Sequence, residues 1–169
     1  RDAGLPPDEA LVERLYQQRL QTKALPYARV EAPLLHTLAE IKRRGLRLGL
    51  LSDCAPEDAA PWPASPLAPL FDAAVFSYQV GTAKPDPACY HIVCARLGVP
   101  PAQALFVGDG AHDELAGAAH AGLVPYRAEW FRDRWPDWQR ARPDRASAMA
   151  FPSLGTLAEL LAAVDAAGA

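Results

Sequence analysis

A short apolar run that ends in glycine and aspartate is the feature that most constrains this chain. Residues 104–107 are all apolar, and Gly108-Asp109 follows them directly. A strand buried on both faces of a parallel sheet has this pattern. Gly108 and Gly110 then turn the chain, and we expect a helix from about Ala111 to Gly122. Asp109 is therefore predicted at the carboxyl end of a strand, where open α/β sheets place their ligands.

A second acid, Asp113, follows Asp109 four residues later. We expect it on the first turn of the helix, on a face that looks back at Asp109. Two carboxylates held this close repel each other, and an oxygen-seeking cation such as Mg²⁺ relieves the repulsion. An aspartate near a helix start is also ordinary capping chemistry, favoured by the helix dipole. The pair taken alone therefore leaves a metal site and a simple cap both open.

Strand-like and helix-like patterns alternate along the whole chain. This alternation predicts an α/β domain with a mainly parallel sheet. We expect helices over residues 7–23, 33–45, 87–98, 111–122 and 154–164, strands over 46–51, 73–77, 104–107, 123–126 and 148–151, and linkers or loops over 24–32, 55–69 and 81–86. The Trp-rich stretch 130–138 covers either the core or a partner surface, and its sequence does not decide between them.

Composition excludes several classes of protein. The chain has 169 residues, which is the length of one domain, and 50% of them are apolar. A net charge of −3 gives no basic footprint for nucleic acid, and no apolar run is long enough for a membrane span. Three cysteines without Cys-x-x-Cys spacing, at positions 54, 89 and 94, fit a reducing, cytoplasmic setting. We expect neither nucleic acid nor a membrane as partner.

Two further polar residues stand where the same sheet would place them. Ser52 ends the strand predicted over 46–51, and Lys84 lies in a loop just before Pro85. Alone, Ser52 is most simply a turn cap and Lys84 a solvated lysine. Together with Asp109, they bring a hydroxyl, a cation and a carboxylate-bound metal to one sheet edge. A phosphoryl group needs this combination, because its negative charge is stabilised by donors and positive charge.

Three segments, in order and spacing, resemble the haloacid dehalogenase-like hydrolase superfamily, in its phosphatase branch with a helical cap. They are Leu50–Asp53, Phe71–Pro87 and Val107–Ala118. The resemblance implies a Rossmann-like parallel sheet with helices on both faces. It also implies an Mg²⁺-dependent phosphatase that hydrolyses small phosphorylated metabolites through an aspartyl-phosphate.

The resemblance also implies roles for individual residues. Ser52 and the backbone after it would hold the phosphoryl group, and Lys84 would offset charge on the nucleophile and the phosphoryl oxygens. Asp109 would ligate Mg²⁺, with Asp113 either ligating it or orienting its waters and Lys84. The family often has Asn where this chain has Asp53. A carboxylate there either points away from the substrate or alters the choice of substrate, so Asp53 is a further candidate for substrate binding.

One part of the family pattern is absent. The family's nucleophile and its acid/base residue lie in an Asp-x-Asp segment after the first strand, and no such segment precedes Ser52. In the family this strand is central, between the strands that end here at Ser52 and Asp109. The chain starts at Arg1, and its one methionine is Met149. We therefore expect a truncated chain, with residues 1–30 a remnant of the cap and linker and residues 31–169 the core.

This absence has a physical consequence. Without the central strand both neighbours expose unpaired backbone groups, at roughly 1–3 kcal/mol for each buried one. We expect an N-terminal segment outside this chain, or another segment, to complete the sheet, and the 169 residues alone to be inactive.

Two other interpretations compete with the phosphatase. The first is a non-catalytic binding or regulatory module that kept the fold and lost the nucleophile segment. The retention of Ser52, Lys84, Asp109 and Asp113 argues against it. The second is a signalling receiver domain, which also uses carboxylates, a hydroxyl and Lys-Pro. Its acidic pair comes first along the chain, whereas here the acids come last.

Overall fold

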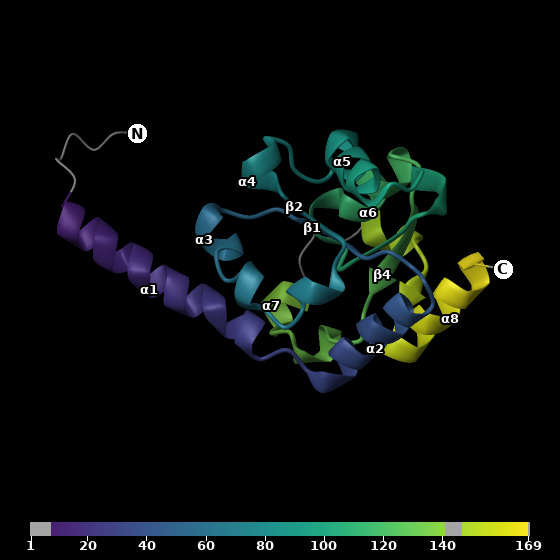
Figure 1. Ribbon diagram of the computed structural model, residues 1–169, viewed down its shortest axis with the longest axis horizontal. Coiled ribbons are helices and arrows are strands. Elements are labelled where there is room, and N and C mark those ends of the chain that lie inside the picture. The colour runs from purple at the N-terminus through teal and green to yellow at the C-terminus, as the bar shows by residue number, and fades with distance from the viewer. Residues whose placement is uncertain (1–7, 141–146, 169) are drawn as a thin grey trace.

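The computed structural model describes residues 8–140 and 147–168, and it shows helices packed around parallel strands (Figure 1). The helices are α1 (Glu9–Ala28), α2 (Ala32–Arg43), α3 (Pro56–Ala59), α4 (Ser77–Val80), α5 (Pro87–Leu97), α6 (Glu114–His120), α7 (Asp137–Arg140) and α8 (Leu157–Gly168). The strands are β1 (Gly49–Ser52), β2 (Ala73–Phe76), β3 (Leu105–Gly108), β4 (Val124–Ala128) and β5 (Ser153–Leu154). None of the described helices combines the length and the apolarity that a membrane span requires.

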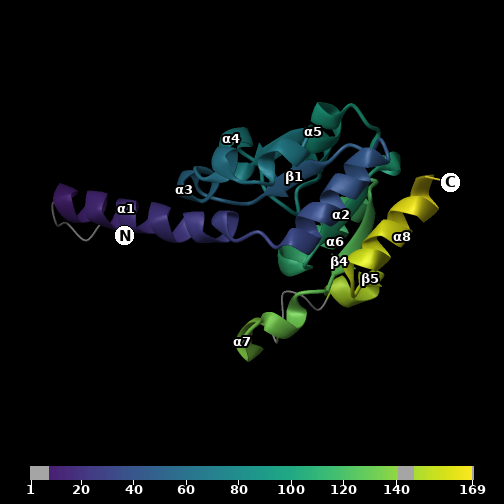
Figure 2. The same cartoon turned by 60° about the horizontal axis from the view of Figure 1, so that its bottom comes forward.

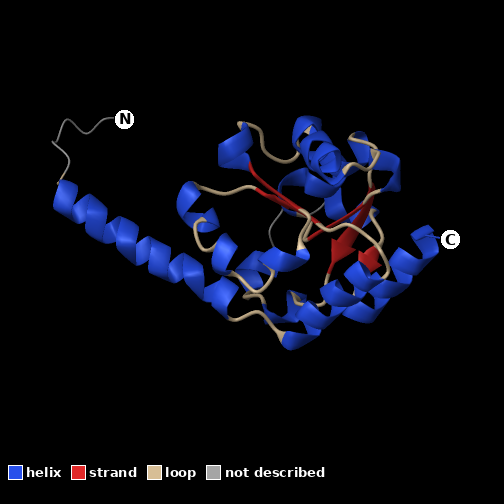
Figure 3. Cartoon of the chain, viewed as in Figure 1, coloured by secondary structure: helices blue, strands red, loops and turns tan. Residues whose placement is uncertain are grey.

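The strands form two parallel sheets, seen in red in Figure 3. In the first sheet β1 pairs with β2, with Leu51 opposite Val75. In the second sheet the order is β3-β4-β5, with Val107 opposite Tyr126. Parallel pairing of strands that alternate with helices confirms the predicted α/β fold.

Helices cover both faces of the strands (Figures 1 and 2). On one face α5 and α6 bury Cys89, Tyr90, Cys94, Ala118 and Ala121. On the other face α2 and α8 bury Leu38, Ile41, Leu160 and Val164. Trp130 packs against this second cluster and lies edge-on to Phe131, with 5.6 Å between the ring centroids. The first part of the Trp-rich stretch thus covers the core; the Trp138 side chain lies outside the described part.

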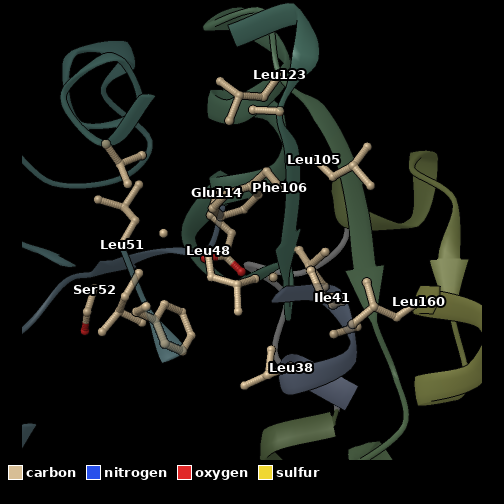
Figure 4. A pocket seen from close by; sticks show the side chains of 18 of the residues that line it. Leu38, Ile41, Leu48, Leu51, Ser52, Leu105, Phe106, Glu114, Leu123 and Leu160 are labelled. Carbon is tan, nitrogen blue, oxygen red and sulfur yellow. The ribbon is translucent and has the colours of Figure 1, made fainter. Parts of the chain in front are cut away.

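A cavity of about 820 Å³ lies between the two sheets (Figure 4). Its walls include Leu51 from β1 and Leu105, Phe106 and Val107 from β3. In the part of the chain that the structure describes, β1 pairs only with β2, and β3 pairs only with β4 and not with β1. All four residues of β3 are consequently half-buried, rather than buried on both faces as the sequence predicts. We call the space between β1 and β3 the slot.

The expected linker over 24–32 is wrong in its first half, because α1 continues to Ala28 with Pro26 inside it. Proline near the end of a helix removes only one late hydrogen bond. Tyr27 offsets this loss: its hydroxyl donates to the Asp58 carbonyl at 3.0 Å, and its ring lies edge-on to Trp62. Tertiary contacts of the last turn therefore extend the helix beyond its sequence signal.

The expected strand over 148–151 is also wrong. Residues 147–150 form a 3₁₀ turn, and the strand β5 comes later. The β4 backbone fixes this position, since the Arg127 N–H donates to the Pro152 carbonyl at 2.8 Å and the Glu129 N–H to the Leu154 carbonyl at 2.9 Å. The four-residue helix α4 was not predicted, because one helical turn is too short to show a helical period.

Replacing Tyr90 by Phe tests the α5–α6 layer. Tyr90 is fully buried, its hydroxyl donates to the Glu114 carbonyl at 2.6 Å, and its ring lies edge-on to Phe106. We expect Tyr90→Phe to lower the free energy of unfolding by about 1 kcal/mol, the worth of one buried hydrogen bond. Urea denaturation measures this, with the exposed Tyr78→Phe as the matched control. Equal losses in both variants would contradict this account of the layer.

Candidate functional site

Lys84 is held at both of its ends. Its ammonium donates to Glu114 Oε2 at 2.7 Å, and the two side chains are only 16% and 6% exposed. Its backbone N–H donates to Asp53 Oδ1 at 3.1 Å. Asp53 directly follows β1, and Glu114 begins α6 shortly after β3. Lys84 therefore joins the carboxyl ends of β1 and β3 across the slot, which shows that both strands end on the same side.

Glu114 is the site residue that sequence reasoning missed. Its Oε1 accepts the Gly110 N–H at 2.9 Å, so the carboxylate has a partner on each oxygen. The carboxylate lies against Gly108, where a Cβ would collide with it. A signal existed in the sequence: Glu114 shares one helix face with Ala118 and Ala121, both buried. An acid on the buried face of a helix needs a partner, and Lys84 supplies it.

The structure places Asp113 just before the helix and not on its first turn, where we expected it. The helix α6 begins one residue after it, and both Asp113 and His112 have left-handed backbone conformations, with φ of 55° and 52°. Its carboxylate accepts a hydrogen bond from the Ser147 hydroxyl. The contact with Lys84 that the resemblance implied for Asp113 is made by Glu114 instead. Whether Asp113 also serves a metal stays a prediction.

Asp109 lies at the carboxyl end of β3, as predicted, and its Oδ1 accepts the Ala111 N–H at 2.9 Å. In the residues that the structure describes, no three His, Cys, Asp or Glu side chains are grouped so that they could hold a metal. Of the nearby acids, Glu114 is paired with Lys84 and Asp113 is bonded to Ser147. Asp109 can hold Mg²⁺ only together with other oxygen donors, because this ion binds through one or two carboxylates, substrate oxygens and waters.

The end of β1 is tied to the end of β2. The Ser77 hydroxyl accepts the Cys54 N–H at 3.0 Å and donates to the Cys54 carbonyl at 3.3 Å. This bond fixes the turn that carries Ser52 and Asp53. Ser77 has no sequence signal for this role, because the contact depends on how the two strands pair.

Ser52, Lys84 and Asp109 line one cavity, together with Asp53 and Glu114. They stand at the polar end of the slot, with Leu51 and Phe106 as its apolar walls; Figure 4 labels Ser52, Leu51, Phe106 and Glu114. The structure therefore brings together three of the four residues on which the sequence analysis depends, and it turns the fourth, Asp113, towards Ser147. A hydroxyl and an ammonium on one rim can bind and polarise an anion, whereas the Asp109 carboxylate would take part only through a bound cation.

The cysteines are poor candidates for a nucleophile. All three are free thiols, and Cys89 and Cys94 are buried. Burial raises the pKa of the Cys89 thiol to about 11 and also raises the pKa of Cys94. Burial likewise raises the pKa of the Cys54 thiol, and the hydrogen bond with the Ser52 side chain, which lowers this pKa, is the smaller effect. Thiols with raised pKa values stay protonated near neutral pH and react slowly.

A sequence model described as hydrolase, haloacid dehalogenase-like hydrolase, matches residues 3–122, most of the chain. The chain belongs to this family. Membership confirms the resemblance drawn from the Ser52, Lys84 and Asp109 segments. It leaves the roles of the individual residues as predictions.

Curated relatives in this family are phosphatases. The chain is 33% identical to a phosphoserine phosphatase of Thermus thermophilus over 147 residues, which are 85% of this chain and 55% of that protein. It is 28% identical to a glyceraldehyde 3-phosphate phosphatase of Methanopyrus kandleri, over 85% of this chain and 61% of that protein. The chain thus spans little more than half the length of these relatives.

Solved structures of the family share the fold. The CbbY structure from Rhodobacter sphaeroides, in complex with phosphate, aligns with a TM-score of 0.65 at 23% identity, covering 98% of this chain and 71% of that one. A haloacid dehalogenase phosphatase from Thermococcus onnurineus aligns with a TM-score of 0.65 at 24% identity, covering 80% and 58%. These likenesses support the Rossmann-like arrangement of strands and helices.

Gly117 tests how closely α6 approaches the lysine loop. A Cβ on Gly117 would lie 2.8 Å from the Cα of Pro85, inside ordinary contact distance. Alanine in a helix is usually about 1 kcal/mol better than glycine. We expect the opposite sign here: Gly117→Ala lowers the free energy of unfolding by about 1–3 kcal/mol, because backbone must move.

Ala119→Gly is the matched control, since Ala119 is exposed on the same helix. It measures helix propensity alone by the same denaturation experiment. A stabilised Gly117→Ala variant would show that Pro85 yields freely and that the contact does not constrain the lysine loop.

Proposed function

We propose that the chain forms the core of a phosphatase that hydrolyses small phosphorylated metabolites, with an extended segment filling the slot between β1 and β3. The observation that supports this most is the Asp53–Lys84–Glu114 bridge. The bridge holds a largely buried cation in the wall of the cavity that Ser52 and Asp109 also line. The relatives named as phosphatases support the reaction class.

The slot defines the chemistry of the segment. Strands β1 and β3 have four residues each, so about four extended residues would pair with both. We propose that they run parallel to both neighbours, as all the described strand pairs do. Leu123 and Val93 line the slot from the α5–α6 face, and Leu38 and Ile41 line it from the α2–α8 face. Side chains on both faces of the segment should therefore be apolar.

The residue after such a strand would reach the polar end beside Lys84. In the proposed reaction an aspartate there attacks phosphorus, the alcohol leaves with a proton from a second acid, and water hydrolyses the aspartyl-phosphate to release inorganic phosphate. Ser52 donates to a phosphoryl oxygen, and the Lys84 ammonium offsets negative charge on the phosphoryl group.

We propose Mg²⁺ as the cofactor, held by Asp109 together with a carboxylate of the inserted segment. When bound, the ion neutralises charge on the phosphoryl group. Asp113 is the further ligand that the resemblance implies, and its bond to Ser147 must then rearrange or be shared. We also propose that residues 1–30 belong to a helical cap, consistent with α1 extending away from the core in Figure 1. The free cysteines support a cytoplasmic location.

A synthetic peptide tests the slot. It carries four apolar residues followed by Asp-x-Asp, with lysines at its amino end for solubility and a fluorescent label. We expect saturable binding to the chain by fluorescence anisotropy and a rise in melting temperature, since a ligand that binds only the folded state stabilises it. A matched peptide with proline at two apolar positions should not bind, because proline cannot complete the strand ladder. Equal behaviour of both peptides would overturn the slot proposal.

The same peptide tests the reaction. With Mg²⁺ and an aryl phosphate, we expect hydrolysis with the Asp-x-Asp peptide and none with an Asn-x-Asn version that binds equally well. Binding without hydrolysis by the Asp-x-Asp peptide would favour the non-catalytic module. Removing Mg²⁺ with EDTA should abolish the rate, and an undiminished rate would contradict the metal proposal.

Site variants test the assigned roles in the hydrolysing mixture. Lys84→Ala and Asp109→Asn should each lower kcat/KM by about 100-fold or more, as expected for lost charge stabilisation. Asp113→Asn should raise the Mg²⁺ concentration needed for half-maximal rate if Asp113 is a ligand. Asp133→Asn, an exposed acid in the Trp-rich stretch, is the matched control. Near-normal rates in Lys84→Ala or Asp109→Asn would refute that residue's role.

A further inference from the structure

Asp53 contacts the lysine loop through the backbone. The Lys84 N–H that it binds is 31 residues away along the chain, at 3.1 Å from Asp53 Oδ1. Two other contacts hold the same loop: Glu114 holds the Lys84 ammonium, and Gly117 lies flush against Pro85. Both of these come from α6, on the β3 side of the slot. Asp53 supplies the contact from the β1 side.

The contact at the ammonium is not enough by itself to fix the position of the Lys84 backbone. A lysine side chain has four rotatable carbon bonds, so one bond at its tip is compatible with many backbone positions. Fixing the backbone N–H removes most of that freedom. Asp53 also follows Ser52 directly, on the turn that Ser77 ties to β2. One rigid turn thus carries the hydroxyl and holds the start of the lysine.

We propose that Asp53 is a positioning residue that sets the distance between the Ser52 hydroxyl and the Lys84 ammonium. It acts by accepting the Lys84 backbone N–H and does not contact the substrate. This role rests on the proposed phosphatase activity for its catalytic consequence, but its structural part does not. It also accounts for an acid beside a phosphoryl site, since that carboxylate is directed at the backbone of the lysine loop.

This role predicts different outcomes for two substitutions of Asp53. The amide oxygen of Asn accepts a backbone N–H as a carboxylate does, whereas Ala has no acceptor. Asp53→Asn should therefore keep Lys84 in place, and Asp53→Ala should release it. A residue that acted through its charge on the substrate would lose its effect in both variants.

Hydrogen exchange of the Lys84 amide, followed by NMR on the 169-residue chain, tests the structural part without any activity. We expect protection to fall by tenfold or more in Asp53→Ala and to stay within about threefold of wild type in Asp53→Asn. Asp133→Ala is the matched control and should leave the amide unchanged. Unchanged protection in Asp53→Ala would overturn the proposal.

Kinetics in the peptide-completed protein test the catalytic part. We expect Asp53→Ala to lower kcat by tenfold or more with KM within about threefold, and Asp53→Asn to restore most of the rate. A change mainly in KM, or equal losses in both variants, would assign Asp53 to the substrate and overturn the proposal. If wild type does not hydrolyse phosphate esters, the proposed function fails, and amide exchange still decides the placement of Lys84.

Discussion

Two parallel strand edges face each other across an apolar cavity, and the rest of the structure is arranged around this constraint. Each buried backbone group left unpaired there costs roughly 1–3 kcal/mol, so a chain of this kind is stabilised strongly by anything that pairs with both edges. The helices α5 and α6 on one side and α2 and α8 on the other already supply both layers (Figure 1). The half-buried state of β3 follows from the slot beside it, since β3 is an edge strand that pairs only with β4 in the described chain.

Lys84 holds the two edges together at one end. Its ammonium and the Glu114 carboxylate are largely withdrawn from solvent, and a buried charge requires a partner of opposite sign. Breaking such a pair by removing one partner leaves the other charge uncompensated, which is more costly than the pair itself is stabilising. The pair therefore serves mainly to position the Lys84 ammonium in the cavity that Ser52 and Asp109 also line, and adds little to stability. Asp53 adds the same constraint from the other strand.

The sequence predicted what local patterns determine. Apolar runs located every strand except β5, and proline with Asp86 predicted the start of α5, where the Asp86 side chain accepts the Ala88 N–H. Ser52, Lys84 and Asp109 could be chosen as candidates because each lies at the end of a predicted strand or precedes a proline. Glu114 was not identified as the partner of Lys84, because spacing cannot show a left-handed backbone at residue 113 that starts the helix one residue later. Pro26 was misread for a related reason: a distant contact of Tyr27 outweighed a local helix-breaking signal.

The proposed strand and the proposed metal ion share one place in the structure, the polar end of the slot. The proposed strand would fill the slot, and the proposed metal would take its oxygen donors from Asp109, the inserted segment, waters and the substrate. A strand that ran parallel to β1 and β3 would end beside Asp109 and Lys84, because both neighbours end there. Its last residue would lie near the Lys84 ammonium, which is already paired with Glu114, and near the Asp109 carboxylate. An acid at that position would add a carboxylate beside Asp109, and a bound cation would relieve the repulsion between the two, so the proposal links completion of the sheet to binding of the metal.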